Sequence, residues 1–148
     1  MSILQLHHIS VVVTDLEAAK VFFTELGMEL EGEAPIEGRW VDRINSIDDL
    51  RCQIAMMKTP DGLGRLELTQ FSNPPAISLD PAIAPPNALG LRSVMFAVDD
   101  IDATVARLQA VGGTLIGEIV QYEEIYRLCY MRGPAGIIVS LAESLGQD

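Results

Sequence analysis

The stretch LHHISVVVTDLEAAKVFFTELGMELEGE, residues 6–33, decides the fold because the chain contains its pattern twice. Residues 91–118 read LRSVMFAVDDIDATVARLQAVGGTLIGE and match it at an offset of 85 positions. Self-similarity over such a length indicates two copies of one supersecondary unit. The identical pairs are Leu6/Leu91, Val13/Val98, Asp15/Asp100, Ala18/Ala103, Gly27/Gly112, Leu30/Leu115, Gly32/Gly117 and Glu33/Glu118.

Each copy predicts a strand followed by a helix. Apolar residues alternate over 9–13 and 94–98, which is the period of a half-buried strand. Asp15 and Asp100 then supply the side-chain oxygen that caps a helix N-terminus, and a glycine follows where each helix should end. The apolar stripes of the two helices are Leu16, Ala19, Phe23 and Leu26, and Ile101, Thr104, Leu108 and Val111.

Three more strands complete each copy, so the order is βαβββ and the fold class is α+β. We expect one module at 4–71 and a second at 91–143 within a single domain. The connector 72–90 contains two Pro-Pro pairs, which disfavour helix and sheet. The expected additional strands are 28–34, 51–58 and 63–71, with counterparts at 113–121, 125–131 and 137–142.

A second irregular stretch, 35–50, has no counterpart in the second copy. It carries Trp40, the one tryptophan of the chain, between Arg39 and Arg43. Long loops often serve function, but a short surface helix fits the same residues. Trp40 is therefore either the lid of a ligand pocket or an anchor that holds this loop to the core.

The composition disfavours some classes of binding partner. The 148 residues are 49% apolar and 21% charged, which supports a packed core, and the net charge of -11 disfavours nucleic acid and anionic membranes. No segment has the length of a membrane-spanning helix, and the N-terminus lacks a signal peptide pattern. We expect a soluble cytoplasmic protein, with Cys52 and Cys129 as buried, reduced thiols.

The duplicated βαβββ unit, with a histidine in its first strand, a DLEAA helix start and the strand GRLELTQF, resembles the vicinal oxygen chelate superfamily. That superfamily includes glyoxalase I, bleomycin resistance proteins, extradiol dioxygenases and fosfomycin resistance proteins. The resemblance implies a cupped sheet in which two modules enclose a ligand cavity. It also implies a homodimer.

Metal-using members of this superfamily place one ligand on the first and one on the last strand of each module. The resemblance carries these positions to His8 and Glu67 in the first copy, and to Ser93 and Ser140 in the second. Strand parity favours His8 over His7, which should share the helix-covered face with Ile9. Because serine is a poor ligand for divalent ions, we expect an incomplete site that holds Zn, Ni, Mn or Fe weakly or not at all.

Other side chains are candidates for ligand contact. All three tyrosines, Tyr122, Tyr126 and Tyr130, fall within nine residues of a chain with only 5% aromatic content. They could line the cup, or they could simply reflect the preference of aromatic residues for strands and dimer interfaces. Arg92 adjoins the replaced ligand position at Ser93 and could bind an anionic group of a ligand, although surface solvation is an equally ordinary role.

Two functions remain in competition. The first is binding of a small organic molecule in the cup between the modules, without chemistry, as in bleomycin resistance proteins. The alternative is a divalent-metal-dependent lyase, isomerase or dioxygenase that uses His8 and Glu67. Glu67 could also act as a general base if an apolar cup raised its pKa.

Overall fold

The structure is a computed structural model that describes residues 2–146, and the chain divides into two compact units, 1–78 and 79–148. The boundary falls inside the proline-rich connector. Each unit repeats the strand–helix–strand–strand–strand order that the sequence predicts, with one extra helix in the first unit. The elements of the first unit are β1 (Ile9–Val12), α1 (Leu16–Leu26), β2 (Glu29–Glu37), α2 (Arg39–Asn45), β3 (Arg51–Lys58) and β4 (Arg65–Asn73).

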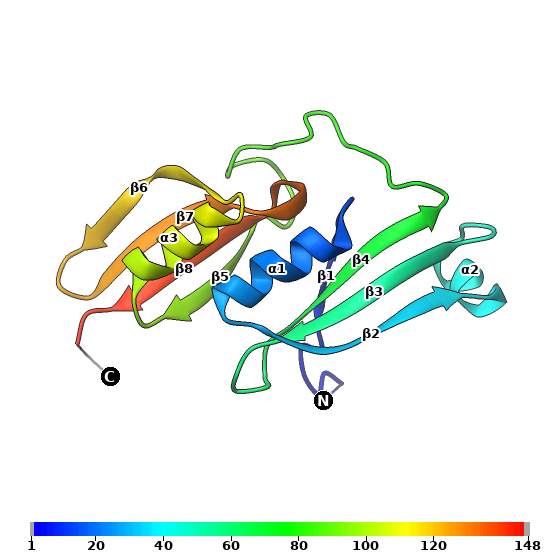
Figure 1. The fold of residues 1–148 in the computed structure, drawn as a ribbon, viewed down its shortest axis with the longest axis horizontal. Coiled ribbons are helices and arrows are strands. Elements are labelled where there is room, and N and C mark those ends of the chain that lie inside the picture. Colours follow the sequence, from blue (N-terminus) through cyan, green and yellow to red (C-terminus); the bar gives the residue numbers. More distant parts are fainter. Residues whose placement is uncertain (1, 147–148) are drawn as a thin grey trace. The chain divides into compact units, whose positions relative to one another are not determined.

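The second unit has the same plan without a counterpart of α2 (Figure 1). A single 3-10 turn precedes its last strand. Within each sheet the first strand pairs in parallel with the last, and the other neighbours are antiparallel. The strand orders are β1-β4-β3-β2 and β5-β8-β7-β6. The elements of the second unit are β5 (Ser93–Val98), α3 (Ile101–Ala110), β6 (Thr114–Tyr122), β7 (Tyr126–Arg132), the 3-10 turn (Pro134–Gly136) and β8 (Ile138–Ser144).

The predicted helix caps are present in both units. The carboxylate of Asp15 accepts the amide N–H of Ala18 at 3.0 Å, and that of Asp100 accepts the N–H of Ala103 at 3.0 Å. A second hydrogen bond, which the sequence did not suggest, connects the first residue of each helix to the last strand of its unit. Gln70 Oε1 accepts the N–H of Leu16 at 2.7 Å, and Glu143 Oε1 accepts the N–H of Ile101 at 2.8 Å.

Each helix covers one face of its own sheet with the predicted apolar stripe. In the first unit Ala19 and Phe23 are fully buried against strand residues such as Leu68, and in the second unit Leu108 and Leu141 are equally buried. Because side chains alternate along a strand, the neighbours of Leu68 point to the other side. We call that side, which carries Ser10, Met56, Glu67 and Thr69, the open face of the first sheet.

The insertion 35–50 contains a short helix, α2, followed by a loop. Strand β2 extends through Glu37, and α2 then packs at the end of the sheet (Figure 1). This helix and the loop after it bury a small apolar cluster with strands β3 and β4. The cluster consists of Val41, Leu50 and Cys52, with Ile36, Ile47, Ile54 and Phe71 partly buried around them.

Both cysteines are buried and unpaired, as the sequence predicts. Within residues 2–146, no helix combines the length and apolar character needed to cross a bilayer.

Candidate functional site

His8 and Glu67 meet beside the open face of the first sheet. Glu67 lies in β4 opposite Ser10 of β1, and His8 immediately precedes β1. The distance from His8 Nε2 to Glu67 Oε2 is 3.8 Å, and the two side chains are 30% and 23% exposed. The two residues singled out in the first module are therefore adjacent, and water or a ligand can reach them.

The two carboxylate oxygens of Glu67 have different surroundings. Oε1 accepts the Ser10 hydroxyl at 3.0 Å and the Thr69 hydroxyl at 3.4 Å. Oε2 faces the imidazole of His8. Hydroxyl groups thus hold the carboxylate in place through one oxygen and leave the other to accept a hydrogen bond from His8 or from a bound molecule.

His7 contacts His8 directly. Their Nδ1 atoms are 2.8 Å apart and the rings meet edge to face at a centroid distance of 5.0 Å. A hydrogen bond between two Nδ1 atoms requires one to carry a proton and the other to be bare, so each ring constrains the tautomer of the other. In either arrangement Nε2 of His8 remains directed at Glu67.

This placement corrects the expectation that His7 shares the helix-covered face with Ile9. Strand β1 begins at Ile9, so its alternation does not extend back to residue 7, and His7 is exposed. Strand parity was therefore the wrong rule for His7. The signal available in the sequence was the adjacency of two histidines, which allows their rings to touch outside regular structure.

The charge of Glu67 influences a neighbour on the same face. Burial raises the pKa of the Cys52 thiol, and the nearby Glu67 carboxylate raises it further.

The matching strand pair of the second unit lacks this chemistry. Ser140 of β8 lies opposite Met95 of β5, just as Glu67 lies opposite Ser10. Ser140 is 1% exposed and its Oγ has no hydrogen-bond partner among the described residues. Ser93 is the first residue of β5 and pairs with Ile138. Hydroxyl groups thus occupy both counterpart positions.

The donor set does not fit the four-ligand metal centre that the resemblance implies. Among the described residues no three His, Cys, Asp or Glu side chains come close enough together to hold one ion. His8 Nε2 and Glu67 Oε2, 3.8 Å apart, supply at most two ligands to one ion. The hydroxyls of Ser93 and Ser140 are weak ligands by comparison.

The three tyrosines lie together on the second sheet, on the face opposite the buried Cys129 and Met131. Tyr122 pairs with Tyr126 across β6 and β7, and Tyr130 lies opposite Ser140. They are 54%, 42% and 39% exposed in chain order. All three tyrosines are therefore accessible to a ligand or a partner, and their role in ligand contact stays a prediction.

Trp40 and Arg92, the other proposed pocket residues, have distinct environments. Trp40 of α2 is exposed and its indole lies close against Gly38. The Nε atom of Arg92 is buried and has no hydrogen-bond partner within the described chain. The structure brings neither of them into contact with His8 or Glu67 through any described interaction.

Comparison with known proteins identifies the family of this chain. The family model of the glyoxalase, bleomycin resistance protein and dioxygenase superfamily matches residues 5–141. The chain belongs to that superfamily. The α+β fold of two βαβββ modules, which the repeat predicted, is thereby confirmed.

Three similar proteins differ in sequence identity and in structural similarity to this chain. A glyoxalase family protein from Bacillus cereus is 49% identical, with a TM-score of 0.93 over 99% of this chain and 97% of its own. An uncharacterised protein of Escherichia coli K12, YaeR, is 35% identical over 72% of this chain and 70% of its own length. TnmS3, an antibiotic binding protein from Streptomyces, is 24% identical with a TM-score of 0.61 over 97% and 98%, and shares the fold.

Proposed function

We propose that this superfamily member binds a small organic molecule through the His8–Glu67 pair at the open face of the first sheet. One observation carries the proposal. Glu67 is fixed through Oε1 by two hydroxyl groups, while Oε2 and His8 Nε2 face each other on partly exposed side chains. A polar pair held in place in this way is suited to recognise a ligand with little loss of side-chain entropy.

The chemistry of His8 and Glu67 limits which functional groups the ligand can carry. A carboxylate accepts hydrogen bonds, so the molecule should present an N–H or O–H group to Glu67. Val12 is 45% exposed on the same face, and Met56 lies beside Glu67, so an apolar portion is also accommodated. A net charge of -11 disfavours strongly anionic molecules. We therefore propose neutral or cationic ligands with an apolar body.

The tyrosine face of the second sheet is a separate candidate surface for contact with an aromatic ligand. Tyr126 and Tyr130 are exposed on the same face of β7, four residues or about 13 Å apart, so a planar ring could stack on one of them. TnmS3, which has the same fold, is described as binding an antibiotic. We therefore propose Tyr122, Tyr126, Tyr130 and Arg92 as ligand contacts of the second unit, and Trp40 as a further ligand contact of the first unit.

A thermal-shift screen with cationic, neutral and anionic aromatic compounds tests the proposal. A compound present at about 100 times its Kd should stabilise the protein by about 2.7 kcal/mol. Glu67→Gln should abolish the shift for the compounds that bind. Glu29→Gln is the matched control, because it removes the same charge from an exposed position of the same sheet.

Two results would contradict the proposal. One is the absence of any stabilising compound in all three classes. The other is a set of compounds whose shifts are equal in the wild type, Glu67→Gln and Glu29→Gln. Loss of the shift in Tyr126→Ala or Tyr130→Ala, with Glu67→Gln unaffected, would place binding on the tyrosine face alone.

Metal-dependent lyase, isomerase or dioxygenase chemistry is a second candidate, favoured by one specific observation. His8 Nε2 faces Glu67 while its Nδ1 is hydrogen-bonded to His7, and such a bond orients a histidine that ligates a metal. A Zn, Ni, Mn or Fe ion held there would act as a Lewis acid. Stoichiometric metal by elemental analysis, lost in His8→Ala and Glu67→Gln, would support this candidate over metal-free binding.

We also propose that the protein forms a homodimer in the cytoplasm. Ile3, Leu4 and Leu6 form an apolar run at the N-terminal end and are 82%, 98% and 76% exposed. A partner copy would remove this surface from water. Light scattering of purified protein should give twice the monomer mass, and a monomer at all concentrations would contradict the proposal.

A further inference from the structure

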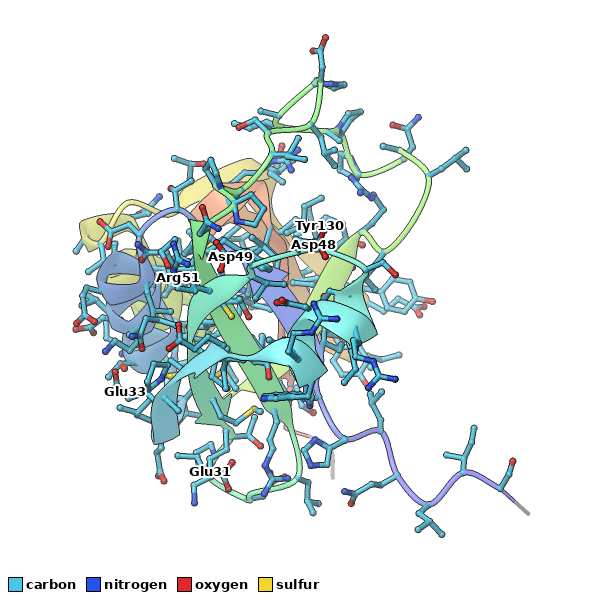
Figure 2. All side chains as sticks on the ribbon, turned by 90° about the vertical axis from the view of Figure 1, so that its right-hand side faces the viewer. Glu31, Glu33, Asp48, Asp49, Arg51 and Tyr130 are labelled. Carbon is cyan, nitrogen blue, oxygen red and sulfur yellow. The ribbon has the colours of Figure 1, made fainter. Side chains whose placement is uncertain are left out.

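A cleft at the α2 end of the first sheet is separate from the His8–Glu67 pair. It has a volume of about 340 Å³, and its lining includes Glu37 from β2, Arg39 and Asp42 from α2, and Asp49 and Arg51 beside β3. Figure 2 shows Asp49 and Arg51 next to each other, with Glu31 at the opposite end of the sheet. The insertion present only in the first module thus creates a hollow that the second module has no element to form.

The wall of the cleft is held by a buried carboxylate. Asp42 is 9% exposed, and its two oxygens accept the N–H groups of Asp49 at 3.0 Å and Leu50 at 2.9 Å. Asn73 Nδ2 donates to the carbonyl oxygen of Asp49 at 2.6 Å. These bonds fix the loop between α2 and β3, and both oxygens of Asp42 are already occupied. Asp42 is therefore part of the framework and has little capacity left for a ligand.

Apart from Asp42, the cleft is lined by charged side chains of both signs. The guanidinium of Arg51 is paired with Asp49, at 3.1 Å, and lies across the strand pair from Glu37. Arg39 and Glu37 have no ion pair or side-chain hydrogen bond among the described residues, and both are exposed. Arg39 offers five N–H donors and Glu37 offers two acceptor oxygens. The cleft therefore presents one unused cation and one unused anion.

The charges of the cleft and of the whole protein determine which net charge of a ligand is favoured. The lining carries Glu37, Asp42 and Asp49 against Arg39 and Arg51, and the whole chain carries -11, so a simple anion is repelled. A simple cation leaves Arg39 unpaired. A molecule with both charges meets both groups and has no net charge to be repelled.

We propose that this cleft binds a small zwitterion of the α-amino acid class, with the carboxylate on Arg39 and the ammonium group on Glu37. A guanidinium can hold a carboxylate through two parallel N–H···O bonds, which gives orientation as well as affinity. The volume of about 340 Å³ accommodates a molecule of that size. The proposal does not depend on the function assigned to His8 and Glu67.

Backbone amide NMR of the full-length protein, titrated with each common amino acid at millimolar concentration, tests the inference. We expect saturable shifts at residues of α2 and of the loop before β3. The tightest amino acid is then compared with its carboxylate-only and ammonium-only analogues, for example L-leucine with 4-methylpentanoate and 3-methylbutylamine. The zwitterion should bind about tenfold or more tightly than either analogue, the loss expected when a charged hydrogen bond is removed.

Variants locate the binding and guard against unfolding. Arg39→Gln and Glu37→Gln should each weaken binding about tenfold or more. Arg43→Gln, a matched control on the next turn of the same helix and outside the cleft, should leave it within about twofold. All three change exposed side chains, so unchanged amide spectra would show that the fold is intact.

Three outcomes would overturn the inference. The first is no saturable shift with any amino acid. The second is equal affinity for the carboxylate-only analogue, which would make the cleft a plain anion site. The third is equal weakening by Arg43→Gln, which would mean that the effect arises from overall charge. None of these outcomes bears on ligand binding by Glu67, which its own variants test.

Discussion

The two units of this chain are alike in their frameworks and different at their exposed faces. Both have an aspartate that caps the helix, and both tie the helix start to the last strand, through Gln70 in one and Glu143 in the other. At the third residue of the last strand the first unit places Glu67, which accepts hydrogen bonds from two hydroxyl groups. The second unit places Ser140, which is buried and without a described partner.

The difference shows which parts of the duplicated unit are constrained by folding. An aspartate cap or a leucine under the helix stabilises either unit in the same way, so both copies keep it. A carboxylate on the open face contributes little to folding, because it is partly exposed and bonded to other polar side chains. The position of Glu67 was therefore free to differ in the second copy. The function is therefore best inferred from positions where the two units carry different residues, such as Glu67 and Ser140.

Core truncation should have the largest effect and should be similar in the two units. Leu68 and Leu141 occupy equivalent positions, opposite Val11 and Phe96, and both are 0% exposed. Leu68→Ala and Leu141→Ala should each reduce the free energy of unfolding of the unit concerned by about 2–5 kcal/mol. Urea unfolding measures the loss, and hydrogen exchange assigns it to β1 and β4 or to β5 and β8. A small effect for only one of them would break the equivalence of the two cores.

Removal of the helix caps should have a smaller and again matched effect. Asp15→Ala and Asp100→Ala each leave one amide N–H of the first helical turn without its acceptor. The expected loss is about 1 kcal/mol in each unit, within the range for N-cap residues. Asp15→Asn and Asp100→Asn retain the acceptor oxygen and should recover most of it. Unequal losses would show that Gln70 and Glu143 do not support the two helix starts to the same extent.

The repeat and its periodicity predicted most of the framework. The expected strand 51–58 coincides with β3, and the other strands agree to within a few residues. The sequence does not decide between a loop and a short helix at α2, because seven residues are too few to show a clear period. The cleft beside it was not predicted. It depends on Asp42 accepting two amides from a loop seven and eight residues away, and residue spacing does not encode such a contact.

The candidate site was predictable in its strand residues and not beyond them. Parity within β4 was enough to place Glu67 on the open face, because Leu66 and Leu68 are buried on the other. The contact between His7 and His8 was not foreseen, since it lies outside the strand where alternation applies. The roles of Trp40 and Arg92 in ligand binding stay predictions.

Ser140→Ala should stabilise the second unit, which sharpens the contrast with Glu67. The variant removes a buried hydroxyl that has no described partner and keeps the volume nearly unchanged. An unsatisfied buried polar group is costly, so the free energy of unfolding should rise by about 1 kcal/mol. Glu67→Ala, by comparison, should change stability little and affect ligand binding. A Ser140→Ala variant that is less stable than the wild type would show that the hydroxyl has a partner in solution.

The buried thiols should produce the smallest effect, at alkaline pH. Burial raises the pKa of both Cys52 and Cys129, and the Glu67 carboxylate raises that of Cys52 further, while Arg127 lowers that of Cys129. Below about pH 8.5 the thiols are protonated in folded and unfolded chains, and their contribution to stability is fully present. As the pH rises further, the unfolded chain loses these protons first, so the free energy of unfolding falls until the folded pKa is passed.

Urea unfolding of the wild type, Cys52→Ala and Cys129→Ala between about pH 7 and 10 measures this term. Each substitution should flatten the alkaline decline, because burial raises the pKa of both thiols. Glu67→Gln should make the effect of Cys52→Ala smaller and leave that of Cys129→Ala unchanged, because the Glu67 carboxylate raises the pKa of Cys52 only. An effect of Cys52→Ala that is unchanged in the Glu67→Gln background would contradict the assignment, because it would mean that this carboxylate does not act on the Cys52 thiol.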